Sequence, residues 1–125
     1  MNYRKFLIAA LLVMSFAVQA KDITVTRLTC EMRDGRVTTS DTPRLGWQMS
    51  SPENGTRQTA YEIEVRDVWA GKVVWNSGKV KSAQSQLVSC ADAVLEKDRH
   101  YTWRVRVWDE ADTPSAWSAP SDFSI

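Results

Sequence analysis

The stretch that most constrains the fold runs from His100 to Asp109 and reads His-Tyr-Thr-Trp-Arg-Val-Arg-Val-Trp-Asp. Apolar side chains recur at alternate positions, which is the pattern of a β-strand with one buried face. One face carries Tyr101, Trp103, Val105 and Val107, and the other carries Thr102, Arg104, Arg106 and Trp108. Aromatic and β-branched residues suit a pleated surface. We therefore expect this strand to lie at the centre of a sheet around which the rest of the chain packs.

The first twenty residues have the features of a secretory signal peptide. Arg4 and Lys5 precede an almost wholly apolar run from Phe6 to Val18, and a Val-Gln-Ala triplet then ends at Ala20. A membrane anchor is the alternative, but an apolar run of about thirteen residues is shorter than the roughly 20 that span a bilayer. Residues 1–20 are therefore predicted to be cleaved. The protein is expected to be exported to the periplasm or outside a bacterial cell, with no membrane attachment after cleavage.

Length and charge indicate one domain, at residues 21–125, that does not bind nucleic acid. The chain has 16 basic and 15 acidic residues, and removal of Arg4 and Lys5 leaves 14 basic residues against 15 acidic ones. Recognition of nucleic acid requires a clustered basic excess. This near balance therefore argues against nucleic acid as a partner.

Turn signals divide the domain into short strands. Besides the strand at 100–109, we expect strands within residues 21–33, 44–49, 59–67, 73–80, 85–90 and 116–125. A change of facing near Thr26-Arg27 predicts a β-bulge in the first strand, at the edge of a sheet. Residues 36–43 and 91–99 are expected to be connections. Strands spaced by about 8–12 residues predict an all-β, antiparallel sandwich of about seven strands.

Four positions resemble a fibronectin type III or immunoglobulin-like sandwich. Trp47 lies in the second expected strand and Tyr61 in the third, while Leu95 is followed by Tyr101 at the start of the long strand. The last two resemble a tyrosine corner, in which the phenol hydroxyl bonds back to the preceding connection. We assign structural roles to these four residues and to Trp103, which points inward by alternation.

A narrower resemblance covers the chain from Leu28 to its end. Its blocks are Leu28–Glu31, Thr42–Trp47, Gln58–Ile63, Val74–Val80, Gln84–Ser85, Tyr101–Asp109 and Pro114–Ser118. In this order they are similar to the N-terminal immunoglobulin/fibronectin-like domain of bacterial α-L-rhamnosidases of glycoside hydrolase family 78. The connection Asp67–Lys72 is shorter than expected for that family, and Arg33-Asp34-Gly35 replaces an Asn-Pro turn. The resemblance implies that the catalytic module, a helical toroid, lies downstream, so none of its catalytic residues has a counterpart here.

The two cysteines, Cys30 and Cys90, are either a disulfide or a pair of buried thiols. Export favours a bridge, because oxidising compartments permit one. In a fibronectin-like topology, however, their strands flank a third strand and so lie nearly 10 Å apart. A disulfide requires Cα atoms within about 7 Å. We therefore predict two buried thiols.

Residues that could support catalysis are better explained by structure. His100 is the one histidine, and a Ser/His/Asp triad needs several parts brought together by the fold. Asp109, Glu110 and Asp112 lie in a turn, where acidic residues are common, and this explains them better than a pair of glycosidase carboxylates does. The spacing of cysteine and histidine matches no zinc site, and no phosphate-binding loop is present. We expect no enzyme activity, no metal and no cofactor in this chain.

Tryptophan is unusually frequent, with six residues in the expected mature chain. Alternation does not place Trp69, Trp108 or Trp117 in the core, and these three form a candidate surface with Arg104 and Arg106. Exposed indoles could stack on sugar rings and bind carbohydrate. Alternatively, the guanidinium groups cover the indoles in cation–π pairs. We favour the second interpretation because it accounts for the residues without a ligand.

Together these features predict an exported, non-catalytic accessory module acting in the breakdown of rhamnosides or polysaccharides. It would act by docking on a catalytic α-L-rhamnosidase domain or another protein domain. We expect either a truncated piece of such a glycoside hydrolase or a stand-alone module. The alternative is a free-standing exported module that binds protein or carbohydrate, the latter a plant-type polysaccharide.

Overall fold

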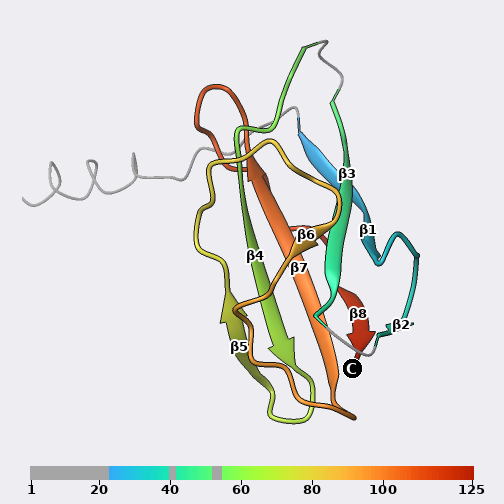
Figure 1. Ribbon diagram of the computed structural model, residues 1–125. Coiled ribbons are helices and arrows are strands. Elements are labelled where there is room, and N and C mark those ends of the chain that lie inside the picture. Colours follow the sequence, from blue (N-terminus) through green and yellow to red (C-terminus); the bar gives the residue numbers. More distant parts are fainter. Residues whose placement is uncertain (1–22, 40–41, 52–54) are drawn as a thin grey trace, which may run out of the picture.

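The computed structural model describes residues 23–39, 42–51 and 55–125 (Figure 1). The predicted signal peptide at residues 1–20 lies outside these ranges. The described residues form β1 (Thr24–Cys30), β2 (Val37–Thr38), β3 (Arg44–Ser50), β4 (Ala60–Asp67), β5 (Lys72–Asn76), β6 (Val88–Ser89), β7 (His100–Trp108) and β8 (Ser121–Ser124). In that part of the chain, no helix is long and apolar enough to cross a membrane.

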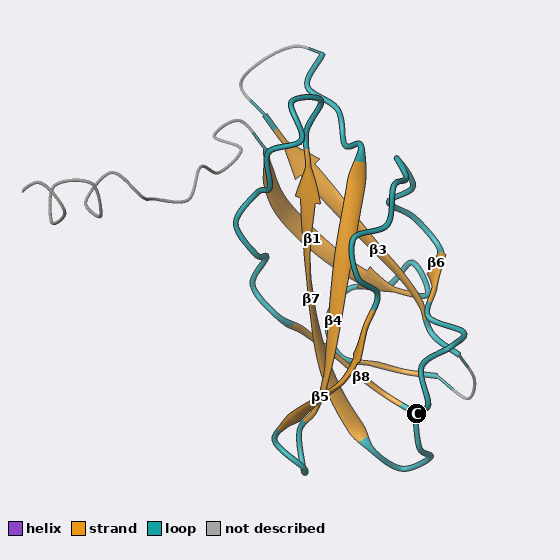
Figure 2. Ribbon diagram, turned by 90° about the vertical axis from the view of Figure 1, so that its left-hand side faces the viewer, coloured by secondary structure: helices purple, strands orange, loops and turns teal. Residues whose placement is uncertain are grey.

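The strands form two facing sheets, so the predicted all-β sandwich is confirmed (Figure 2). One sheet has the order β1-β3-β6 and the other the order β2-β8-β7-β4-β5. Every pairing is antiparallel except that of β2 with β8, which is parallel. The sandwich was predicted to be antiparallel, and it is antiparallel except at this pair. Strand β2 lies in a polar stretch expected to be a connection, and it pairs because Val37 is buried opposite Phe123.

The strand predicted to be central is β7, which lies between β4 and β8. Residues 101–108 of β7 pair with the whole of β4, from Trp108 opposite Ala60 to Tyr101 opposite Asp67. Its inward residues join a core between the sheets. The buried members of that core include Ile23, Val25, Leu45, Trp47, Tyr61, Ile63, Val65, Val88, Tyr101, Trp103, Val105, Val107 and Phe123.

The first strand has the predicted bulge, because the register of β1 against β3 shifts between Val25 and Arg27. The last strand is shorter than expected and covers four residues instead of 116–125. The hydroxyls of Ser115 and Ser118 accept hydrogen bonds from the main-chain N–H groups of Val107 and Val105. Serine side chains thus take the place of backbone acceptors before β8, so these residues run beside β7 without forming a regular ladder.

Candidate functional site

Cationic and indole side chains from β7 and its neighbours lie together over the outer face of β7. Arg104 and Arg106 place their Cζ atoms 4.3 Å and 4.7 Å from the centroid of the Trp117 ring. The Arg106 Cζ also lies 5.1 Å from the Trp108 centroid, and Lys79 Nζ lies 4.9 Å from that same ring. All four distances are within the roughly 6 Å range of cation–π attraction. We call these five side chains the arginine–tryptophan ladder.

Two glutamates of β4 hold the arginines in place. Glu64 lies opposite Arg104 and Glu62 opposite Arg106 in the β4–β7 register. Arg104 Nε donates to Glu64 Oε1 over 3.0 Å, and Arg106 Nε donates to Glu62 Oε1 over 2.8 Å. Opposite charges across an antiparallel pair stabilise it. The guanidinium groups are thereby fixed over the indoles and already have anionic partners.

The ladder leaves little bare indole surface. Trp108 lies on the outer face, as alternation indicates, yet only 7% of its surface is exposed. It lies outside the core cluster and is covered instead by Arg106 and Lys79. Trp117 is half-buried and comes from the irregular segment before β8. This arrangement differs from the open aromatic face that a sugar-binding interpretation of Trp108 requires.

Trp69 belongs to a different site, the turn between β4 and β5. Its surface is 70% exposed, and one contact is with Arg99, whose Cζ lies 5.1 Å from the ring centroid. Arg99 in turn pairs with the buried carboxylate of Asp67. The pKa of Asp67 is lowered by the backbone N–H of Ala70 and by Arg99. Trp69 is therefore an exposed indole on a turn held by the contacts of Asp67 with Arg99 and Ala70. It is separate from the other four residues of the predicted surface.

The residues assigned structural roles lie in or beside the core. Trp47 packs edge-on against Tyr61, with ring centroids 5.3 Å apart, and against Trp103 at 6.5 Å. Tyr101 is 1% exposed, and its hydroxyl accepts a hydrogen bond from the backbone N–H next to Leu95, that of Glu96, over 2.8 Å. This is the geometry of a tyrosine corner. Leu95 is half-buried and packs against the core.

Both cysteines are free and buried. Burial raises the pKa of Cys30 to about 11 and that of Cys90 to about 12. Cys90 donates its thiol hydrogen to the carbonyl of Pro43 over 3.3 Å. Because the thiolate is the reactive form of cysteine, these groups are poor nucleophiles in the folded protein.

His100 is poorly arranged for catalysis. Arginine can only donate, so the 3.3 Å contact from Arg36 to His100 Nε2 makes that nitrogen an acceptor. Nδ1 of the neutral ring then donates to Ser124 Oγ over 3.0 Å. A nucleophilic serine needs the opposite direction, with its proton passing to the histidine. Asp122 is a further 4.0 Å neighbour of Nε2.

The acidic residues after β7 are occupied by local contacts. Asp109 accepts hydrogen bonds from the backbone of its own turn, at Ala111 and Thr113. Asp112 pairs with Lys79, which joins the turn to the ladder. The remaining acid, Glu110, lines a pocket and is described next.

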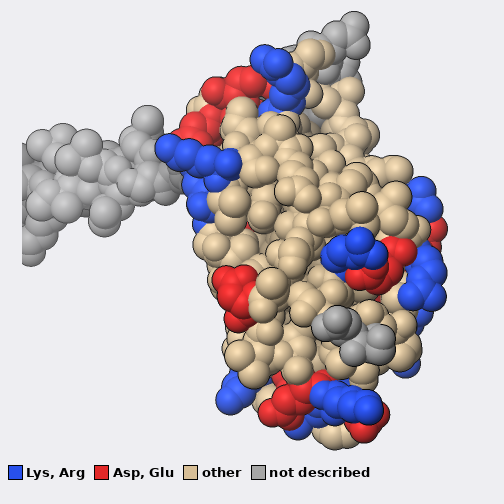
Figure 3. Space-filling view, viewed as in Figure 1, with Lys and Arg blue, Asp and Glu red and all other residues tan. Residues whose placement is uncertain are grey.

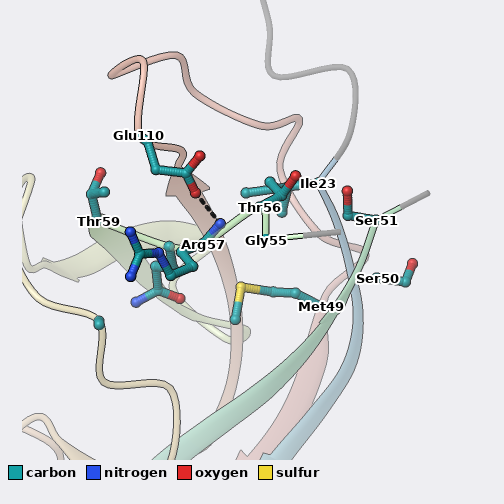
Figure 4. Close-up of a pocket in the computed structure, with 11 residues that line it drawn as sticks. Ile23, Met49, Ser50, Ser51, Gly55, Thr56, Arg57, Thr59 and Glu110 are labelled. Atoms are coloured by element: carbon teal, nitrogen blue, oxygen red, sulfur yellow. Dashed lines mark hydrogen bonds between the residues drawn. The ribbon is translucent and has the colours of Figure 1, made fainter. Parts of the chain in front are cut away.

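A pocket of about 610 Å³ lies between Met49, the segment 55–59 and Glu110 (Figure 4). The Glu110 carboxylate accepts a hydrogen bond from the main-chain N–H of Arg57. It is the one carboxylate among the described residues that line the pocket, whereas glycoside hydrolysis uses two. The described residues also hold no group of three or more His, Cys, Asp or Glu side chains that could bind a metal ion.

Three members of the site were not predicted from the sequence. Glu62 and Glu64 anchor the arginines, and their alternation with apolar residues in the third expected strand was a usable signal. Lys79 follows β5 and reaches the ladder from the other side of β4. Its pairing with Trp108 depends on the fold and has no signal in the sequence.

Comparison with known families accounts for almost the whole described chain. The family described as "Rha78A-like, N-terminal immunoglobulin domain" matches residues 25–125. This chain belongs to that family. The resemblance drawn from the sequence blocks is thereby confirmed.

The chain is also similar to a region of two α-L-rhamnosidases. It is 48% identical over 82 residues to the enzyme of Streptomyces avermitilis, covering 63% of this chain and 8% of that protein. It is 33% identical over 91 residues to an α-L-rhamnosidase of Formosa agariphila, covering 69% of this chain and 10% of that protein. The match therefore spans about a tenth of these relatives.

Solved structures give the same result. The Streptomyces avermitilis α-L-rhamnosidase complexed with L-rhamnose superposes with a TM-score of 0.74 and 40% identity, over 81% of this chain and 10% of that one. The structure of the α-L-rhamnosidase of Dictyoglumus thermophilum superposes with a TM-score of 0.71 and 29% identity, over 80% of this chain and 12% of that one.

Proposed function

We propose that this chain is a non-catalytic accessory module of α-L-rhamnosidase type that acts by packing on a catalytic domain. It contributes to rhamnoside or polysaccharide breakdown by stabilising and positioning that domain. The observation that carries the proposal is the match of residues 25–125 to the N-terminal immunoglobulin domain family. Because the matched region is about a tenth of each relative, the rest of such a polypeptide supplies both the catalytic machinery and the docking partner.

The chemistry of the described residues supports a structural role. The acidic side chains near the candidate sites are engaged: Glu62 and Glu64 by arginines, and Asp109 by its own turn. The ladder arginines are likewise paired with glutamates, so the charges on the outer face of β7 already have partners within the domain. We infer no bond-making step for this chain.

The test is a chimera of the Streptomyces avermitilis α-L-rhamnosidase in which residues 25–125 of this chain replace the matching region. The half-life of α-L-rhamnosidase activity at elevated temperature is compared for the complete enzyme, a deletion of the region and the chimera. We expect the deletion to shorten the half-life and the chimera to restore it. An unchanged half-life after deletion would contradict the proposal, as would release of nitrophenol from an aryl α-L-rhamnoside by this chain alone.

A second candidate is a free-standing exported module that binds carbohydrate, favoured by the 70% exposed indole of Trp69. Only one contact on that ring is with a cation, so part of the ring remains available for stacking. Titration with rhamnose-containing oligosaccharide, followed by tryptophan fluorescence, tests it. A saturable shift that is lost in Trp69→Ala but kept in Trp117→Ala would support this function.

Export is part of the proposal and rests on the basic, apolar and small-residue pattern of residues 1–20. Expression in a bacterial host followed by cell fractionation tests it. We expect the protein in the periplasm or medium with Lys21 as its N-terminal residue. An uncleaved protein in the cytoplasmic or membrane fraction would contradict export with cleavage.

A further inference from the structure

One side of the sandwich is covered by ten consecutive residues without a charged side chain, from Ser82 to Ala91, in a chain of which 25% of residues are charged. This segment includes β6 and follows the crossing from β5, so it joins the edges of the two sheets (Figure 1). Figure 3, seen from the same side, shows a broad central area without Lys, Arg, Asp or Glu. We call residues 82–91 the uncharged edge.

Glutamine side chains hold the uncharged edge in one conformation. Gln58, which is buried, donates to the carbonyls of Ser82 and Gln84 over 3.0 Å and 2.9 Å. Gln84 donates to the carbonyls of Gln86 and Leu87 over 3.0 Å and 3.2 Å, and Gln86 donates to the carbonyl of Trp47 over 2.9 Å. A surface that is already ordered loses little conformational freedom when a partner binds it.

Gly46 makes room for this arrangement. A Cβ atom at that position would lie 2.8 Å from Gln86 Oε1 and 2.8 Å from Thr29 Oγ1. The close approach lets the Gln86 side chain lie on β3 and tie the uncharged edge to it. The edge is therefore a fixed part of the sandwich surface although only Val88 and Ser89 of it form a regular strand.

Leu87 lies within this edge in an unfavourable conformation. Its φ is 53°, in the left-handed region that disfavours residues with a Cβ, and its side chain is 42% exposed. Met32 also has a positive φ, but it is in a tight turn closed by the Cys30–Arg33 pairing, which accounts for it. Leu87 has no such turn and is only partly buried. Strained backbone conformations without a local structural cause cluster at active sites, ligand clamps and switch regions.

Building on the proposed accessory role, we infer that the uncharged edge, with Leu87 at its centre, docks against an apolar, uncharged surface of another domain of an α-L-rhamnosidase-type polypeptide. Interface centres are depleted of charge, and a partner charge placed here would lose its hydration without gaining an ion pair. The ladder face is the contrasting case, because Arg104 and Arg106 already have their glutamates and remain suited to solvent.

Hydroxyl-radical footprinting of the free chain and of the chimera tests the location of the docking surface. Leu87 and Val68 form a matched pair, with side chains from residues that are 42% and 44% exposed. We expect oxidation of Leu87 to slow severalfold in the chimera while that of Val68 is unchanged. Protection of Val68 or Trp69 without Leu87 would overturn this inference and leave accessory docking intact. If Leu87, Val68 and Trp69 are all oxidised as fast in the chimera as in the free chain, both this inference and accessory docking would be overturned.

A second measurement on this chain alone tests the role of Leu87. Glycine adopts positive φ without a steric cost, so Leu87→Gly should raise the melting temperature of the free chain, whereas Val68→Gly should not. In the chimera the same Leu87→Gly change should lower the melting temperature, because the docking side chain is lost. The inference would be contradicted if Leu87→Gly did not raise the melting temperature of the free chain. It would also be contradicted if Leu87→Gly raised the melting temperature of the chimera.

Discussion

The hydroxyl of Tyr101 satisfies a main-chain donor in an otherwise irregular connection. The backbone N–H of Glu96 donates to it, and the Tyr101 ring stacks on Phe123 with centroids 5.5 Å apart. The ring anchors the connection 91–99 to β7 while contributing apolar area to the core. A single side chain thereby fixes how the chain enters its central strand.

Replacement of Tyr101 separates these two contributions. Tyr101→Phe leaves the Glu96 N–H unpaired and should lower the free energy of unfolding by about 1–3 kcal/mol. Tyr101→Ala also creates a cavity and should lower it by about 3–5 kcal/mol. Tyr61→Phe is the matched control, since the Tyr61 ring is buried but its hydroxyl has no hydrogen-bond partner in the described part of the chain. Equal urea midpoints for Tyr101→Ala and the unmodified protein would rule out the tyrosine corner.

The buried thiols predict a loss of stability at alkaline pH. From an ordinary pKa of 9.0, burial raises the pKa of Cys30 to about 11 and of Cys90 to about 12. Between pH 9 and these values the unfolded chain releases protons that the folded chain retains, so stability is complete below pH 9 and falls as pH rises. Urea melts from pH 8 to 11 should show this fall, and Cys90→Ala should reduce it.

Thiol counting provides the independent check on that prediction. The denatured, non-reduced protein should react with two equivalents of a thiol reagent, while the native protein reacts slowly. If the denatured protein has no reactive thiol, Cys30 and Cys90 form a disulfide and the alkaline effect has another origin.

At the scale of the strand, the outer face of β7 is stabilised by interleaved cations and indoles. Trp117 contacts two guanidinium groups, and Arg106 contacts two indoles and Glu62. Each exposed cation–π contact contributes about 0.5–1 kcal/mol. The contribution is modest per contact, but it attaches the irregular segment before β8 to the central strand.

Trp117→Ala removes two of these contacts and should lower the free energy of unfolding by about 1–2 kcal/mol. Arg66→Ala is the control, because this exposed arginine of β4 bonds a carbonyl and contacts no indole. Its effect should stay within about 0.5 kcal/mol. Denaturant melts of both variants give the comparison. A Trp117→Ala protein as stable as Arg66→Ala would show that the ladder contributes nothing.

The strands were predictable where local pattern determines them. The alternation of 100–108 reveals β7, and the facing change near Arg27 reveals the bulge in β1. The short strand β2 was not predictable, since Val37 is ordered by Phe123 from the far end of the chain. Likewise, Ser115 supplies a hydroxyl acceptor to β7, a contact that no local pattern encodes.

The candidate site divides in the same way. The arginines and indoles of the outer face follow from alternation in one strand and its neighbour. The contact of Lys79 with Trp108 does not follow from alternation, because Lys79 lies after β5 in the chain and is brought to the ring by the fold. Leu87 was missed for a different reason: its φ of 53° is one that leucine rarely adopts, so the residue type gives no signal of it.

At the scale of the whole molecule, two sides of the sandwich differ in chemistry. The outer face of the five-stranded sheet carries charges that are paired within the domain. The uncharged edge carries none, and its backbone is fixed by side-chain hydrogen bonds. We propose that this asymmetry serves the accessory role, with one side stable in water and the other joining another domain.

The proposed docking of this module is tested most directly by calorimetric unfolding of the free chain and of the chimera. Contact with the rest of the enzyme adds interactions that exist only in the folded state, which raises apparent stability. We expect the transition of the free chain to be absent from the chimera, because residues 25–125 melt at a higher temperature together with their partner. An independent transition in the chimera at the midpoint of the free chain would contradict it.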